Sequence, residues 1–124
     1  MKDEIVTCVI LVLLIGLFVF TSHTINGGTK KLSDALQKAE EAAFKAGDAK
    51  EEFDKAKKLW EKEKKPLFYI CEHSIIMEID ENITLGCDYI NEGDEEKAVV
   101  VCKKAKILLE DLQEREKIRL DNIF

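Results

Sequence analysis

The chain has 124 residues, of which 46% are hydrophobic and 35% are charged, and it contains a single proline. This composition excludes a largely disordered protein and is typical of one small, helix-rich domain. The net charge of −6 argues against a nucleic-acid partner, because phosphate binding needs a clustered excess of Lys and Arg. Residues 66–96 contain nine acidic side chains and no Lys or Arg. Such a segment suits either a basic partner or an antiparallel bundle that neutralises itself.

Residues 5–22 carry no charge and are almost wholly apolar. At about 1.5 Å per residue, a helix of this length approaches the roughly 30 Å thickness of the hydrocarbon core of a bilayer. A cleaved signal peptide is the alternative. Against it, the apolar run is long, Asp3 and Glu4 offset the positive charge that a signal peptide carries before this run, and no Ala-x-Ala cleavage site follows. We therefore predict an uncleaved, single-pass transmembrane anchor over residues 1–22.

The orientation of this anchor is only weakly encoded. Lys2 precedes it and Lys30 and Lys31 follow it, so the basic residues barely distinguish the two sides. A short tail before an anchor and a long domain after it is the usual arrangement of an exported domain. We therefore expect residues 24–124 to lie outside the cytoplasm, at the cell envelope.

Residues 23–29, which include Asn-Gly-Gly, are predicted to be a flexible linker. Residues 30–124 are predicted to form an all-α bundle domain. A first helix is indicated by apolar residues at alternating spacings of four and three, which are Leu32, Leu36, Ala39, Ala43 and Ala46. Gly47 is expected to end it.

A second helix is expected to begin at Asp48, with Glu51 three residues later in the pattern of a capping box. Its apolar positions include Phe53, Ala56, Leu59 and Trp60. Pro66 lacks an N–H and disfavours helix at Lys65, so we predict a kink or break there and a new stretch from Leu67.

The stretch from Leu67 is predicted to be a central helix that ends at Gly93, and Asp94 is expected to cap a last helix. The central helix has the apolar positions Ile76, Ile79, Ile83, Cys87 and Ile90, and the last helix has Ala98, Val101, Cys102, Ala105, Leu108, Leu109 and Leu112. The two Gly-Asp breaks, at 47–48 and 93–94, indicate two helical hairpins. We predict that they pack as a closed antiparallel bundle, because two units are too few for a repeat array.

Three cysteines, Cys71, Cys87 and Cys102, lie beyond the apolar segment. No Cys-x-x-Cys pair occurs and the chain has only two histidines, so the ligand spacing of a structural zinc site is missing. We expect no metal and no cofactor, and buried free thiols. A disulfide between Cys87 and Cys102 is the alternative.

The candidate functional residues are Trp60, Glu72, His73 and Asp80. His73 and Asp80 are seven residues apart and share a helical face, and His titrates near neutral pH, so a proton-responsive cluster is one interpretation. The other is a structural histidine, buried beside acidic groups, and we favour it. Trp60 is suited either to anchoring a partner or to filling the core. No nucleophile and base are spaced for catalysis, so we expect no enzyme.

A resemblance to a known family rests on a few parts of the chain, which are Trp60, Glu72-His73-Ser74, Gly93-Asp94 and the terminal segment 116–124. With them the chain resembles a family of small bacterial proteins of unknown function that have one N-terminal transmembrane helix and a helical domain. The resemblance implies a membrane protein of Gram-positive-type bacteria and implies no activity. Together with the pattern, it favours a membrane-anchored interaction or assembly module, whose partner is an unknown protein or a second copy of the chain. The alternative function is a membrane-tethered sensor of pH, cations or a small ligand.

Overall fold

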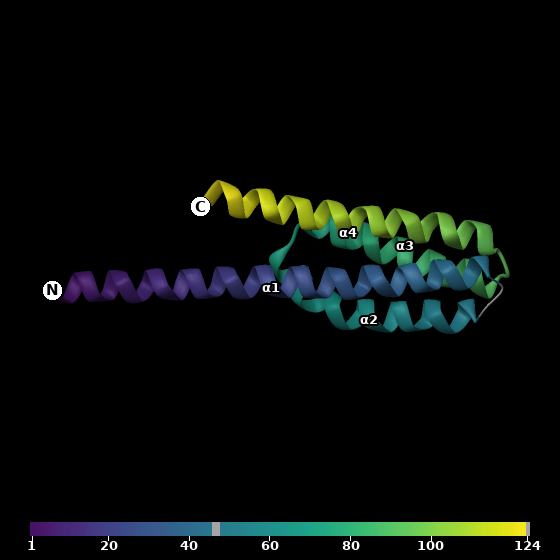
Figure 1. Cartoon of the computed structure of the whole chain (residues 1–124), viewed down its shortest axis with the longest axis horizontal. Coiled ribbons are helices and arrows are strands. Elements are labelled where there is room, and N and C mark those ends of the chain that lie inside the picture. The colour runs from purple at the N-terminus through teal and green to yellow at the C-terminus, as the bar shows by residue number, and fades with distance from the viewer. Residues whose placement is uncertain (46–47, 124) are drawn as a thin grey trace.

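The computed structural model describes residues 1–45 and 48–123, and over these residues it consists of four α-helices (Figure 1). Their bounds are α1 Lys2–Phe44, α2 Ala49–Ile70, α3 His73–Asn91 and α4 Glu95–Ile123. Each helix runs antiparallel to the next, and α1 packs on α2, α2 on α3, α3 on α4, and α4 on α1. The helices therefore close a four-helix bundle, which confirms the predicted all-α fold of an apolar N-terminal helix and two packed hairpins.

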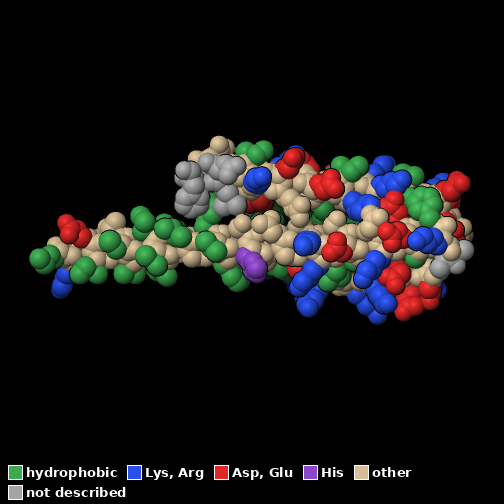
Figure 2. Space-filling model, in the orientation of Figure 1, with side chains coloured by type: hydrophobic (Ala, Val, Ile, Leu, Met, Phe, Trp, Pro, Cys, Tyr) green, Lys and Arg blue, Asp and Glu red, His purple; other side chains and the backbone are tan. Residues whose placement is uncertain are grey.

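α1 has two parts with different surroundings. Its N-terminal part projects beyond the bundle, and apolar side chains cover it (Figure 2). Leu13 and Phe20 in this part are 66% and 67% exposed, whereas Ile25 and Leu32 further along α1 are buried in the bundle. α1 is thus a helix long and apolar enough to cross a membrane, and its second part is one wall of the bundle.

The flexible linker predicted over residues 23–29 is not found, because α1 continues through this segment without a break. Ile25, Gly28 and Thr29 are buried, and a Cβ on Gly28 would lie 2.8 Å from Oε2 of Glu63 in α2. The lack of a side chain on Gly28 therefore leaves room for the carboxylate end of the Glu63 side chain beside α1. Packing of this kind overrides the poor helix propensity of two consecutive glycines.

The core is formed by the stripes that the spacing of apolar residues predicts. All of the predicted positions that the structure describes are buried or partly buried, including Leu36, Phe53, Ile83 and Leu109. Ala46 and Gly47, which were predicted to close the first helix, lie outside the described residues. The core thus rests mainly on aliphatic side chains from all four helices.

The break between α2 and α3 lies at Cys71 and Glu72, which have extended backbone conformations, and not at Lys65 as predicted. α2 continues through Pro66 because the proline removes only one backbone hydrogen bond, near the end of the helix. Leu67, directly after it, is 1% exposed and anchors this last turn in the core. Packing therefore moves the break five residues beyond the proline.

The helix that begins after Gly93 has the predicted cap. Gly93 has a φ of 81°, a conformation that favours glycine, and the backbone N–H of Lys97 donates to Asp94 Oδ1 at 3.2 Å. Asp48 precedes α2 as expected, but its side chain makes no capping hydrogen bond, so the predicted capping box is not formed there.

Candidate functional site

Trp60 and Asp80 meet inside the interface between α2 and α3. The Trp60 side chain is fully buried, and its Nε1–H donates to Asp80 Oδ1 at 2.8 Å. Lys64, one turn further along α2, lies 3.4 Å from the same oxygen. Partial burial lowers the pKa of Lys64, but hydrogen bonds to Glu61 and Asp80 outweigh this and leave that pKa above its ordinary value. Trp60 is thus a core residue whose one polar atom is satisfied.

Glu72 lies in the connection between α2 and α3 and joins it to α4. Arg115 Nη1 donates to Glu72 Oε2 at 2.8 Å, and the Ser74 hydroxyl donates to Glu72 Oε1 at 3.0 Å. Both side chains of the ion pair are more than half exposed, so the pair orients the connection more than it stabilises the fold.

His73 is not buried beside acidic groups, so that prediction is wrong. It is exposed, and its ring stacks on Phe68 with the centroids 4.1 Å apart. The cause is the break at Cys71 and Glu72, which starts α3 at His73 and turns its side chain back onto the end of α2. His73 stacks on Phe68, whereas Glu72 pairs with Arg115 and Asp80 accepts from Trp60. The four candidates therefore form three separate contacts rather than one cluster.

Metal-binding side chains do not cluster in the part of the chain that the structure describes. Within residues 1–45 and 48–123, no three or more His, Cys, Asp or Glu residues are grouped so that they could hold a metal ion. Cys71, Cys87 and Cys102 are buried and are not joined by disulfides. The Sγ of Cys102 donates to the Leu36 carbonyl at 3.2 Å, and burial together with nearby Glu40 raises its pKa to about 12. A thiol with so high a pKa is protonated and unreactive at neutral pH.

Two polar contacts between α1 and α4 had no signal in the sequence. Glu40 is 7% exposed and pairs with Lys106, and it has Lys103 at 3.7 Å. Closer to the apolar part of α1, Gln113 Nε2 donates to the buried Thr29 hydroxyl at 2.6 Å. Glu40 and Lys106 are 66 residues apart in the chain, and Thr29 and Gln113 are 84 apart. Only knowledge of which helices are neighbours could have revealed these contacts.

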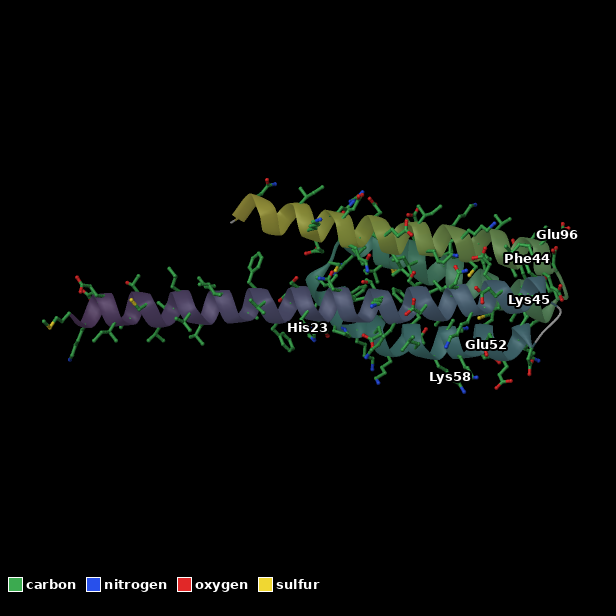
Figure 3. The ribbon with its side chains drawn as sticks, in the orientation of Figure 1. His23, Phe44, Lys45, Glu52, Lys58 and Glu96 are labelled. Carbon is green, nitrogen blue, oxygen red and sulfur yellow. The ribbon has the colours of Figure 1, made fainter. Side chains whose placement is uncertain are left out.

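An open cleft of about 710 Å³ lies between α1 and α4, next to the contact between Thr29 and Gln113. Its lining includes Asn26 and Lys30 from α1 and Lys117 from α4, together with acidic side chains of α4. His23 lies where α1 enters the bundle, on the side of α1 that faces away from α4 and this cleft (Figure 3). The mixed charge and the wide opening of the cleft are unlike the apolar, enclosed sites that hold small molecules.

Comparison with known families gives one match. A family described as a domain of unknown function (DUF4363) matches residues 19–123. The chain belongs to this family. The match confirms the resemblance to a family of uncharacterised proteins, and it spans the end of the apolar segment and the whole bundle. In this DUF4363 protein the family region therefore begins inside α1, before the helix enters the bundle.

No curated protein and no solved structure matches the chain. Any functional inference about this DUF4363 domain therefore rests on its own structure.

Proposed function

We propose that this protein is a single-pass membrane protein whose helical bundle is a non-enzymatic interaction or assembly module at the cell envelope. The observation that carries the proposal is the division of α1 into an exposed apolar part and a part built into the bundle. A helix that exposes this much apolar surface is stabilised by lipid, which satisfies apolar side chains while the helix satisfies its own backbone.

The outer face of α4 supports a role in binding protein. Val100 and Ile107 are 52% and 63% exposed, and they are seven residues apart, so they share one stripe. Ile118, which is 59% exposed, lies on the same stripe eleven residues further on. Single exposed apolar residues are ordinary, but a stripe of them beside charged side chains suits the core of a small interface, including one with a second copy.

Photo-crosslinking in intact membranes tests the interaction. A crosslinking side chain at Ile107 is expected to give one discrete product, with twice the mass of the chain if the partner is a second copy. The matched control is Lys58, which is exposed on α2 and away from the stripe (Figure 3). Equal products from both positions, or none from Ile107, would contradict the proposal.

The anchor is tested separately, by the mass of protein extracted from membranes. We expect residues 5–22 to be retained and the protein to stay with the membrane in alkaline carbonate. An N-terminus near His23 or later would exclude an uncleaved anchor.

The alternative of a pH or cation sensor receives no support from a specific contact. It relied on the acidic central helix together with Glu72 and His73. Glu72 instead pairs with Arg115, and Asp80 of that helix accepts from Trp60. His73 stacks on Phe68.

A further inference from the structure

We propose that the end of the bundle nearest the apolar part of α1 lies in the interfacial layer of the membrane that holds α1. The surface consists of Tyr69 with Phe68 at the end of α2, and the C-terminal end of the α4 backbone lies near the same level. This inference rests on the proposed anchoring of α1. It adds that the bundle itself docks on the lipid surface.

The register between α1 and α2 places Tyr69 at the membrane boundary. Gly28 of α1 contacts Glu63 of α2, and antiparallel helices advance by the same rise per residue. Tyr69, six residues beyond Glu63, is therefore level with Ser22, six residues before Gly28. Ser22 is the last residue of the apolar segment, so Tyr69 lies where lipid tails give way to headgroups.

The register between α1 and α4 places the end of α4 still deeper. Thr29 accepts from Gln113, so Ile118 is level with Thr24, and the end of α4 at Ile123 is level with Val19 in the apolar segment. In Figure 1 the end of α4 extends past the connection between α2 and α3, alongside α1. This end of the bundle therefore reaches the level at which α1 becomes apolar.

Two aromatic side chains at this level, Tyr69 and Phe68, suit an interface. Tyr69 is 88% exposed and Phe68 is 36% exposed, although both are aromatic and would be costly to leave in water. Tyrosine is enriched at membrane–water boundaries, because its ring prefers the apolar side and its hydroxyl prefers water.

The length of the apolar segment also draws the bundle toward the lipid. Residues 5–22 span roughly 27 Å as a helix, slightly less than the roughly 30 Å hydrocarbon core. Because residues 23–29 are helical and partly buried in the bundle, no flexible linker separates the two. A short span with no linker holds the bundle against the headgroups.

The two ends of the bundle differ in charge, and the more basic end is the one nearest the apolar segment. At the end near the apolar segment, residues 23–31, 61–76 and 113–119 contain eight Lys or Arg and five Asp or Glu. At the far end, residues 41–52 and 88–97 contain three Lys and nine Asp or Glu. The basic end therefore faces the anionic headgroups and the acidic end points away from them.

Quenching by brominated lipid tests the proposal with the full chain. The protein is reconstituted in vesicles of phosphatidylcholine and phosphatidylglycerol whose acyl chains carry bromine near the headgroup. Three variants each add one tryptophan at an exposed position: Phe20→Trp in the apolar segment, Tyr69→Trp at the proposed surface, and Phe44→Trp at the far end of the bundle (Figure 3). Subtracting the parent spectrum removes Trp60, which is the sole native tryptophan and is fully buried.

The added emission of Phe20→Trp and Tyr69→Trp is expected to shift to shorter wavelength and to lose most of its intensity, and that of Phe44→Trp to change little. If Phe20→Trp is quenched but Tyr69→Trp is not, the docking proposal fails while the anchor stands. If Phe20→Trp is not quenched, the anchor itself fails. If Tyr69→Trp is shielded only as the ratio of protein to lipid rises, a second copy covers this surface, which also overturns the proposal.

Discussion

Trp60 is the largest fully buried side chain, and the indole N–H is the single polar group of this side chain that burial removes from water. Asp80 accepts its hydrogen bond from the neighbouring helix, and Lys64 offsets the charge of that carboxylate. The contact joins two residues that are twenty positions apart in the chain, and it fixes the register of α2 against α3. Of the two interpretations of Trp60, anchoring a partner or filling the core, the structure therefore supports the second.

Removing the acceptor should destabilise the bundle. Asp80→Ala leaves the buried N–H of Trp60 without its protein partner, and we expect a loss of about 1–2 kcal/mol in the free energy of unfolding. Urea unfolding monitored by the fluorescence of Trp60 measures it. Glu81→Ala, at an exposed neighbouring position, is the control and should change stability little. Equal midpoints for the two variants would show that the hydrogen bond contributes nothing.

Cys102 makes the stability of the bundle depend on alkaline pH. Its folded pKa of about 12 exceeds the ordinary value of 9.0, so its contribution is complete below pH 9 and is lost as pH rises toward 12. Over this range the parent should lose up to about 1.4 kcal/mol per pH unit more than Cys102→Ala does.

Melting temperatures between pH 8 and about 11 measure this difference in slope. Val101→Ala also removes a buried side chain next to Cys102, but nothing that titrates. It should lower stability at every pH and keep the slope of the parent. A slope for Cys102→Ala equal to that of the parent would place the thiol in contact with water.

At the residue scale, the sequence could predict which apolar side chains are buried, but not the surroundings or partners of the polar ones. Periodicity identified Ile83 and Cys102 as core positions, because helical spacing alone decides which side chains share a face. The exposure of His73 could not be predicted, because it depends on a two-residue break whose position is decided by packing around Leu67. Arg115 as the partner of Glu72 needed the order of helices around the bundle.

Two helical glycines show how the elements fit together. Gly86 in α3 is buried, and a Cβ there would lie 3.0 Å from the ring of Phe53 and 3.5 Å from Val101. Gly27 in α1 has open space where its Cβ would be. The first glycine is required by close packing, and the second only weakens its helix.

Alanine at these two positions should therefore have opposite effects. Gly27→Ala is expected to raise the free energy of unfolding by up to about 1 kcal/mol, the difference in helix propensity. Gly86→Ala is expected to lower it by about 1 kcal/mol, because overpacking against a buried ring outweighs the same gain. Chemical denaturation of both variants measures the pair, and a stabilised Gly86→Ala would mean that α2 can move away from α3 at low cost.

The buried face of α3 can be tested by placing a charge on it. Ile83 is 4% exposed, so Ile83→Asp buries an unpaired carboxylate and should prevent stable folding or cost more than about 4 kcal/mol. Met77→Asp on the same helix starts from a side chain that is 60% exposed and should melt near the parent. Circular dichroism gives both melts, and similar curves would mean that the assigned face is wrong.

At the element scale, the four helices could be predicted and their ends only in part. Gly93 and Asp94 were recognisable because a positive φ and a capping carboxylate each require particular residues. The segment 23–29 was misread, because Asn-Gly-Gly favours a turn in isolation. Here the absent side chain of Gly28 instead allows a helix to pack against Glu63.

The whole molecule offers a way to determine its side of the membrane. The native thiols suit the experiment, because three are buried in the bundle and Cys8 lies within the apolar segment. We expect Phe44→Cys to react with a membrane-impermeant maleimide in intact cells, because we place the bundle outside the cytoplasm. Lys2→Cys, on the other side of the anchor, should react only after lysis, and the reverse result would invert the orientation.

The unbroken course of α1 also fixes the azimuth of the apolar segment relative to the bundle. Eighteen residues make five full turns, so Gly16 points in the same direction as Asp34, and His23 in the same direction as Glu41. All four positions are exposed in this chain. A membrane partner that binds the Gly16 side of the apolar segment would therefore contact the bundle at Asp34 and Glu41, on the exposed face of α1. Because α1 is unbroken, a rotation of its apolar segment about the helix axis would rotate the entire bundle by the same angle.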